Sequence, residues 1–482
     1  MLLALLLVAA EALPPQARLE SSLLDAVNGL CGSLKVSVDR DLTRACQAYV
    51  GAVRSGRARV SGPAVTFFAS LESAEPAPVA AVATVHPPSQ ADRAVGELFP
   101  KSCRFNRIGV AAGVLPEGGA VVCALSALHG TDLARIPGRV QVGQKVVVAG
   151  TLAPGLARPR LFVTRPGGGV DEIHLTARGG RFSATVPMKA RGEHSIEVLA
   201  DGPGGPQVVA TRRVFAGATP PTRPPPDPPS GAGLEGVEAA IAHLRASRGL
   251  SPLRRDPELD AAAEAHSQEM ARLRTFAHVL PTDGGPADRL RARGYAYSSV
   301  AENIGLSSDV GRAHEAIAGS PAHLANLLDP RHRRLGLGAA RGATADGPEG
   351  VYLTELFAVP VVGSKDPAGD VVRVIAGKRR ALGLPALTRD PALDALADHA
   401  VRAIALADQM KLDKELTARA LAQAPQLSSA AAELRVGSAP GEVGASKNLA
   451  EPRWTRLGVG ALYASSRRYG PGRLWIVLLY GR

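Results

Sequence analysis

Hydrophobic and polar residues alternate in short runs between residues 135 and 217. Seven runs show the alternation, separated by turns that contain Gly or Pro: 140–142, 145–149, 160–164, 172–176, 181–186, 194–200 and 207–214. A period of two places one face of a strand on a core and the other face in water. Strands at this spacing are typical of an immunoglobulin-like β-sandwich. We therefore predict this fold for residues 135–217, as a spacer or adhesion module.

A second hydrophobic pattern, with helical spacing, recurs three times along the chain. Each copy opens at an aspartate that suits a helix N-cap and precedes an Ala- and Leu-rich segment: Asp39, Asp256 and Asp390. Each copy closes with a strand at 107–111, 334–338 or 456–460, followed by a second apolar strand. The repeat predicts three related α-β-α domains, at residues 19–130, 234–360 and 369–482. The middle copy is the longest between these landmarks, so we expect the function to lie there.

Prolines and the N-terminus mark the remaining segments. The run at 219–231 is rich in consecutive prolines, which fix φ and lack an amide donor, so we predict an extended linker at 218–233.

Residues 1–10 are apolar but too few to span a bilayer, and Ala10-Glu11-Ala12 suits signal cleavage. We predict a signal peptide at 1–18 and a secreted, periplasmic or cell-envelope location. Because no Lys or Arg precedes the run, a core-packing helix is the alternative.

The cysteine pattern agrees with export. All four cysteines lie in the first predicted domain: Cys31, Cys46, Cys103 and Cys123. An even number within one domain of an exported protein predicts two disulfides, and three pairings are open. No Cys-x-x-Cys spacing is present, which argues against a zinc ribbon.

Composition narrows the class of protein. A chain of 482 residues is too long for one core, and 45% hydrophobic with 21% charged residues is typical of globular domains. Long apolar stretches beyond the N-terminus are lacking, so we expect no transmembrane span other than the signal segment. The net charge is +12, but no Lys/Arg block alternates with aromatic residues, so we expect no nucleic-acid partner. Composition leaves the oligomeric state open.

The middle copy contains the side chains that could form a metal-binding or proton-transfer site. Residues 259–273 form one amphipathic helical stripe, which puts His266 on the buried face as a core histidine bonded to the backbone. Beyond it lie His278, Glu302 and His323, and Ser320 before Pro321 predicts an N-cap for the helix that carries His323. Two imidazoles and a carboxylate suit zinc or another divalent metal. Without a metal, the same trio could shuttle a proton.

The order of short motifs in this copy resembles the bacterial branch of the CAP superfamily, which comprises cysteine-rich secretory, antigen 5 and pathogenesis-related-1 proteins. The resemblance covers residues 234–359. Its motifs are Gly249-Leu-Ser-Pro-Leu253, His266-Ser267, Phe276-Ala-His278, Arg289, Gly294-Tyr295, Glu302-Asn303, Ser320-Pro-Ala-His323, Asn326, Gly336-Leu-Gly338 and Tyr352-Leu-Thr-Glu-Leu-Phe357.

This resemblance implies an α-β-α sandwich with a central antiparallel sheet and a cleft. The cleft is expected to be lined by His278, Glu302 and His323, with Asn303, Ser320 and Asn326 in supporting places. Some members of the family bind a divalent metal there, and others bind sterols, lipids or extracellular partners. Two positions depart from the family pattern. Ile317 replaces the usual Trp, and Glu355 replaces the usual Gln, with its side chain expected in solvent. The outer copies lack these motifs and are expected to be degenerate relatives without metal.

The sequence thus predicts an exported, multidomain α+β protein with a non-catalytic binding cleft. The expected ligand is a small lipid-like molecule or a cell-envelope component, and the expected cofactor, if one is bound, is zinc or another divalent metal. A metal-assisted hydrolase or peptidase using Glu302 as ligand or general base is the first alternative. An adhesion or interaction scaffold with a vestigial cleft is the second. A Ser267, His278 and Asp283 triad lacks the Gly-x-Ser-x-Gly nucleophile context.

Overall fold

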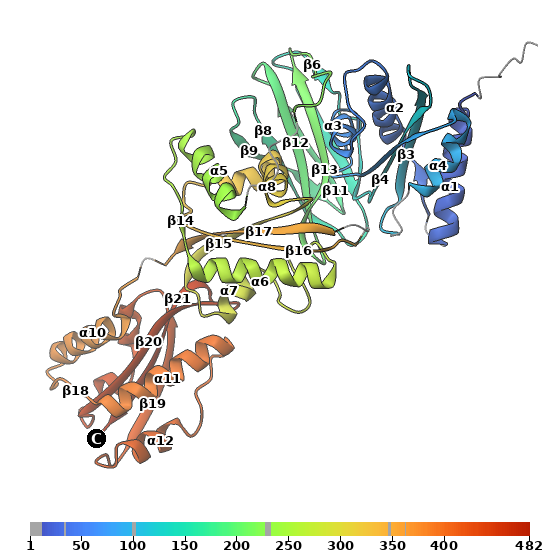
Figure 1. Ribbon diagram of the computed structural model, residues 1–482. Coiled ribbons are helices and arrows are strands. Elements are labelled where there is room, and N and C mark those ends of the chain that lie inside the picture. The colour runs from blue at the N-terminus through green and yellow to red at the C-terminus, as the bar shows by residue number, and fades with distance from the viewer. Residues whose placement is uncertain (1–11, 33–34, 99–102, 227–232, 346–348, 362) are drawn as a thin grey trace, which may run out of the picture.

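The computed structural model describes residues 12–32, 35–98, 103–226, 233–345, 349–361 and 363–482 (Figure 1). Most of the predicted signal peptide, residues 1–11, lies outside this range, as does the 227–232 part of the predicted linker. Helix α1 begins at Gln16 and buries Leu19, Leu23 and Val27, so the first folded domain starts before residue 19. Within the described part of the chain, every helix is too short or too polar to cross a bilayer.

The N-terminal domain packs helices on both faces of a four-stranded sheet of order β1-β3-β4-β2. Helices α2 and α3 share one core with this sheet, and α1 and α4 share another on the opposite face. Disulfides join Cys31 to Cys103 and Cys46 to Cys123, which selects one of the three open pairings. The elements are α1 (Gln16–Cys31), β1 (Ser37–Val38), α2 (Arg40–Arg54), α3 (Gly62–Glu72), β2 (Val79–Val85), η1 (Pro88–Gln90), α4 (Ala91–Glu97), β3 (Arg107–Val114) and β4 (Ala120–Ala127).

Residues 131–216 form a β-sandwich of two sheets, with orders β10-β11-β7-β5 and β6-β13-β12-β8-β9. Apolar residues from both sheets share one core. The elements are β5 (Thr131–Leu133), β6 (Arg139–Val140), β7 (Lys145–Leu152), β8 (Ala157–Thr164), β9 (Val170–Ile173), β10 (Thr176–Arg178), β11 (Arg181–Pro187), β12 (Gly192–Gly202) and β13 (Gly205–Ala216).

The predicted number of strands in this sandwich is wrong. These described residues form nine strands, not seven, because β5 precedes the predicted range and the run at 172–176 is divided between two sheets. Strand β9 pairs with β8 in one sheet, and β10 pairs with β11 in the other. The chain passes from sheet to sheet within two residues, a change of direction that periodicity alone does not reveal.

The middle domain has three layers around the sheet β14-β16-β17-β15. Helix α6 covers one face, and α5, α8 and α9 cover the other (Figure 1). The short β14 pairs in parallel with β16, so the sheet is mixed and not purely antiparallel as expected. The elements are α5 (Leu234–Ala246), β14 (Arg254–Arg255), α6 (Pro257–Leu273), α7 (Pro286–Ala292), β15 (Tyr297–Ser307), α8 (Val310–Gly319), α9 (Pro321–Leu328), β16 (Arg334–Ala343) and β17 (Glu349–Pro360).

The C-terminal domain has the corresponding strand order, β18-β20-β21-β19, with α11 on one face and α10 on the other. Its elements are α10 (Pro367–Ala381), β18 (Thr388–Arg389), α11 (Pro391–Ala407), α12 (Leu416–Gln423), β19 (Ala430–Gly437), η2 (Pro440–Ala445), η3 (Asn448–Ala450), β20 (Arg456–Ser466) and β21 (Gly470–Gly481). All three α/β domains therefore arrange their strands in the same way.

The predicted helix starts are confirmed in all three domains. Asp39, Asp256 and Asp390 each accept a hydrogen bond from a backbone amide in the first turn of the following helix. A glycine on the facing strand then lets the helix approach closely. A Cβ at these glycines would collide with the helix backbone, in the pairs Gly109 with Leu42, Gly336 with Leu259, and Gly458 with Leu393.

A buried arginine occupies the same place in the middle and C-terminal domains. Arg245 and Arg379 are both fully buried. Arg245 donates to the carbonyl oxygens of residues 251, 327 and 329, and Arg379 donates to those of residues 385, 449 and 451. In each domain the guanidinium thus joins the end of the first helix to the loop before the central strands. This shared anchor extends the likeness of the two domains from strand order to side chains.

Candidate functional site

Three separate elements bring His278, Glu302 and His323 together in the middle domain. His278 lies between α6 and α7, Glu302 on β15, and His323 in the first turn of α9. His278 Nδ1 lies 2.9 Å from Glu302 Oε1. The two imidazole rings are 6.4 Å apart, centre to centre, and are inclined by 31°. Three of the motifs that carried the resemblance therefore meet at one place.

Arg289 is a member of this cluster that the sequence analysis did not assign to the site. Its guanidinium is 2% exposed and pairs with Glu302 Oε2. It also donates to the carbonyl oxygens of His278 and Gly284, at 3.2 and 2.8 Å. Arg289 therefore fixes the Glu302 carboxylate and the loop that carries His278. The Arg289 motif was the available signal, but sequence could not show which way the side chain points.

Glu302 is ionised although it is buried. Burial acts to raise the pKa of its carboxyl, but the hydrogen bond with His278 and the charge of Arg289 outweigh burial and bring the pKa below its usual range. The carboxylate uses both oxygens in these contacts. Glu302 is thus arranged to orient His278, so that the tautomer of His278 has its proton on Nδ1.

His266 is the core histidine that the helical stripe predicted. It is fully buried, and its Nε2 lies 3.1 Å from the carbonyl oxygen of Ala277. The other nitrogen, Nδ1, lies 2.8 Å from Asp283 Oδ2. Because Arg289 also approaches Asp283 at 3.5 Å, His266 belongs to the supporting layer beneath His278.

His323 is held differently from His278. Its Nδ1 lies 2.7 Å from the hydroxyl of Ser320. Burial, with a smaller contribution from the charge of His278, lowers the pKa of His323 to about 4. At neutral pH this imidazole is therefore uncharged, which is the form that ligates metals or accepts a hydrogen bond.

Asn303 and Asn326 lie behind these side chains. Asn326 donates to the side-chain oxygen of Asn303 at 2.9 Å, and Asn303 donates to the carbonyl oxygen of His323 at 3.3 Å. Asn303 also donates to Glu355 at 3.1 Å. The two amides link strand β15 to helix α9, and their role in ligand binding stays a prediction.

The expectation that Glu355 faces solvent is wrong. Its side chain is fully buried and contacts His314 Nδ1 at 2.7 Å as well as Asn303. Glu355 lies on the central strand β17, between β15 and β16, where helix α8 covers the sheet. A carboxylate at this register position has no path to water and needs polar partners instead. The hydrophobic pattern of the strand alone did not show that helix α8 covers the face of β17 on which Glu355 lies.

The serines do not form a nucleophile site. Ser267 donates to the carbonyl oxygen of Gly338 at 3.0 Å and contacts Thr354 at 2.8 Å, deep under the sheet. It makes no contact with His278 among the described residues. Ser320 does contact His323, but its hydroxyl donates to the carboxylate of Glu197 at 2.9 Å. Its proton therefore points away from the imidazole that would have to accept it.

The donor set fits a metal only in part. The described residues contain no group of three or more His, Cys, Asp and Glu side chains arranged around a common ion. The Glu302 side chain is 1% exposed and its two oxygens already contact His278 and Arg289, so its predicted role as a ligand would need one of these contacts to be shared or replaced. By contrast, no hydrogen bond to Nε2 of His278 or of His323 occurs within the described ranges. These two nitrogens could ligate a divalent ion, with Glu302 as the carboxylate that orients one of them.

The corresponding place in the C-terminal domain is a hollow without this chemistry. Both α6 and α11 end in a left-handed residue, Arg274 and Asp408, so Ala400 corresponds to His266 and Leu412 to His278. The strand register matches Glu302 with Ala432 in the same way.

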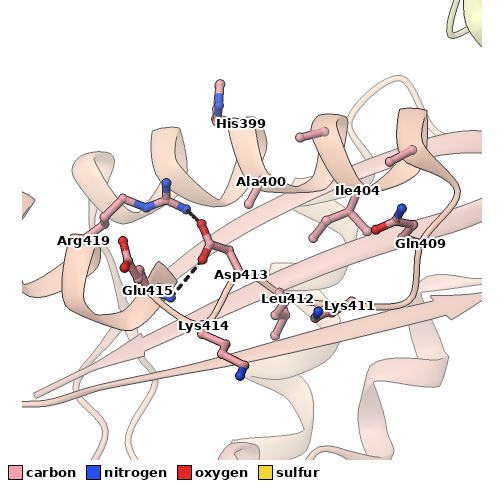
Figure 2. Close-up of a pocket in the computed structure, with 12 residues that line it drawn as sticks. His399, Ala400, Ile404, Gln409, Lys411, Leu412, Asp413, Lys414, Glu415 and Arg419 are labelled. Carbon is pink, nitrogen blue, oxygen red and sulfur yellow. Dashed lines mark hydrogen bonds and ion pairs between the residues drawn. The ribbon is translucent and has the colours of Figure 1, made fainter.

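A space of about 540 Å³ lies there. Figure 2 shows the side chains that line it. Its lining includes Ile404, Leu412 and the paired Asp413 and Arg419. His399 lies one position before the counterpart of His266, as expected from the sequence. The cluster of the middle domain is therefore absent from this described region.

Comparisons with known proteins agree with these observations for the middle domain. Residues 239–357 match the family described as CAP, the cysteine-rich secretory protein family. The uncharacterised protein YkwD of Bacillus subtilis (strain 168) is 34% identical over 95 residues, which are 20% of this chain. The chain spans 37% of the length of that relative.

Solved structures of low identity are also similar. An outer surface protein of Borrelia burgdorferi is 22% identical, with 26% of this chain and 92% of that chain covered and a TM-score of 0.23. An extracellular SCP-domain protein of Bacillus anthracis is 17% identical, with 48% and 86% covered and a TM-score of 0.23. A cysteine-rich secretory protein of Staphylococcus aureus is 12% identical, with 48% and 89% covered and a TM-score of 0.20. The family match and the motifs together identify residues 239–357 as a CAP domain within a larger multidomain chain.

Proposed function

We propose that this chain works outside the cell as a non-catalytic binding protein, with its ligand site at His278 and His323 of the CAP domain. Two disulfides are typical of proteins that fold in oxidising compartments. The printed names of two structural relatives describe an outer surface protein and an extracellular protein. Both points support an exported location for this chain.

The two oriented imidazoles carry the proposal. Each ring has its Nδ1 engaged, His278 with Glu302 and His323 with Ser320. Each therefore offers Nε2 as a lone-pair donor, and the rings lie close enough to contact one ligand. A divalent ion such as zinc is the ligand class that this pair suits best. The same lone pairs are also able to accept hydrogen bonds from a lipid-like or cell-envelope molecule, which is the second ligand class.

The flanking domains complete the proposal. The common strand order, the three capping aspartates and the paired Arg245 and Arg379 support an origin of the outer domains as CAP-type copies. The C-terminal copy carries Ala400 and Leu412 where the CAP domain has His266 and His278. We assign the outer copies, and an immunoglobulin-like sandwich, a structural or partner-facing role.

A metal-assisted hydrolase is the weaker alternative. A general base must have a free lone pair within reach of its substrate. The side chain of Glu302 is only 1% exposed and already pairs with Arg289 and His278, so it is poorly placed to take a proton from a substrate. The binding function needs only the free nitrogens of the imidazoles.

Zinc titration of the full chain tests the proposal. We expect one equivalent per chain by calorimetry and elemental analysis, and a loss of affinity of at least about 10-fold in H278A and in H323A. H243A is the matched control, because His243 is an exposed histidine of α5, and it should bind as the parent does. Circular dichroism checks that each variant is folded. Equal zinc uptake by the H278A/H323A double variant, or no uptake by the parent chain, would refute an ion site here.

A further inference from the structure

Glu197 is a buried carboxylate that the neighbouring β-sandwich directs at the CAP domain. It lies on β12 and is 3% exposed. No Lys, Arg or His within the described ranges forms an ion pair with it. A buried carboxylate without a cation is costly, so its hydrogen bonds need an explanation.

Both partners of Glu197 belong to the start of helix α9. Its Oε1 accepts a hydrogen bond from the hydroxyl of Ser320 at 2.9 Å and from the backbone amide of Ala322 at 3.0 Å. Ser320 is at the predicted N-cap position but makes no capping bond with its own side chain. The expected capping role of Ser320 is thus taken by Glu197, 125 residues away from Ala322.

This arrangement determines how Ser320 contacts His323. A serine hydroxyl has one proton, and here the carboxylate of Glu197 accepts it. The oxygen of Ser320 can then only accept from His323, whose Nδ1 is 2.7 Å away. His323 must therefore carry its proton on Nδ1, which leaves the Nε2 lone pair free.

The sandwich also contacts the segment that carries His278. In the turn between β12 and β13, the carbonyl oxygen of Gly204 accepts a hydrogen bond from the amide of Val279 at 3.0 Å. Apolar packing joins Phe162 and Leu199 of the sandwich to Ala322 of α9. The position of Glu197 is therefore fixed by a continuous contact and not by one flexible side chain.

We propose that Glu197 is a positioning residue of the CAP-domain site, supplied by a different domain, which holds His323 in the Nδ1–H tautomer through Ser320. The inference rests on the proposed ligand role of His323. Residues that hydrogen-bond the second nitrogen of a metal-ligating imidazole orient the ring, and their loss reduces metal affinity about 10–100-fold. In this chain Glu197 and the imidazole of His323 belong to different domains.

The tautomer is tested directly by ¹⁵N NMR of the full-length protein labelled with ¹⁵N-histidine. The His323 signals are assigned by their loss in H323A. We expect the Nδ1–H pattern in the parent protein and in E197Q, because the glutamine oxygen can still accept both hydrogen bonds. E197A should shift His323 towards the other tautomer and weaken zinc binding at least about 10-fold. E193A is the matched control, because Glu193 lies on the same strand but pairs with Arg213 at the surface.

S320A provides a second test if E197A fails to fold. It removes the link to His323 but leaves Glu197 able to cap α9 through Ala322, and we expect the same change of tautomer. An unchanged Nδ1–H tautomer in folded E197A or S320A would overturn the inference. So would an E197Q variant that behaves as E197A does. The NMR result does not depend on zinc, so a parent chain that binds no zinc would refute the proposed ion and leave the role of Glu197 standing.

Discussion

Glu197 and Glu302 are both buried carboxylates, but their neighbours move their pKa values in opposite directions. For Glu302 the hydrogen bond with His278 and the charge of Arg289 outweigh burial, and the pKa is lowered. For Glu197 no cation is near among the described residues, so burial dominates and raises the pKa to about 7, against the hydrogen bonds from Ala322 and Ser320. Glu302 is thus charged at neutral pH, whereas Glu197 is close to its titration point.

The raised pKa of Glu197 predicts a pH-dependent stability. The folded chain binds this proton more tightly than the unfolded chain, whose carboxyl titrates near 4.5. Its contribution to the free energy of unfolding is therefore complete below pH 4.5 and is lost as the pH rises to about 7. The loss amounts to about 3 kcal/mol. In E197Q this loss is absent, so calorimetry from about pH 4.5 to 8 should show E197Q gaining stability over the parent protein as the pH rises. Parallel curves for the two proteins would contradict the assignment.

Sequence predicted the two imidazoles and the residues that contact them, but not the side chains that hold those residues in turn. His278, Glu302 and His323 stand in recognisable motifs, so their places could be carried over. The direction of Arg289 depends on how α7 packs, and the contact from Glu197 depends on how two domains meet. Neither is encoded in local spacing. Glu355 shows the same limit within one domain, because its burial follows from the helix that covers β17.

At the scale of elements, helix starts were the most predictable feature. An aspartate before a helical apolar pattern satisfies free amides locally, so the three caps need no tertiary information. Most strands of the sandwich could also be predicted locally, because alternating hydrophobic and polar residues suit a strand with one buried face. The division of residues 172–176 between two sheets could not, because a change of sheet leaves the hydrophobic pattern intact. The arginine anchors, Arg245 and Arg379, were also not visible until the fold placed the carbonyl oxygens around them.

These anchors predict a selective loss of stability. R379M would leave the carbonyl oxygens of residues 385, 449 and 451 without their donor, and we expect the C-terminal domain to lose about 3 kcal/mol or more. Trp454 and Trp475 are the two tryptophans of the chain, and both lie in this domain, so their fluorescence during urea unfolding reports on it alone.

R245M is the matched control, because it removes the counterpart of the same anchor from the middle domain. Its tryptophan transition should coincide with that of the parent protein. A shift of the same size in R245M would mean that the two domains unfold as one unit. No shift in R379M would mean that the anchor contributes little.

At the scale of the whole molecule, covalent cross-links are confined to the first domain among the described residues. Cys46 and Cys123 are fully buried between α2 and β4. Cys31 and Cys103 are partly exposed where α1 ends. The CAP domain and the domains beside it have no such cross-link in the described chain and depend on packing.

The difference in burial predicts stepwise reduction. With increasing dithiothreitol under native conditions, Cys31–Cys103 should open first, since a thiolate must reach the sulfur that it attacks. Cys46–Cys123 should resist until the N-terminal domain unfolds. Alkylation followed by peptide mass spectrometry measures both, and zinc binding at His278 and His323 should be unchanged after the first step. Opening of the buried bond first would contradict this order.

The contact between Glu197 and Ser320 joins residues on opposite sides of the proline-rich segment. A gene rearrangement that moved residues 234–360 to a new neighbour would transfer both imidazoles and leave their outside acceptor behind. The heritable unit of this site is therefore larger than the recognisable CAP domain. An alignment trimmed to that domain keeps His278 and His323 but loses strand β12, whose Glu197 sets the tautomer of His323.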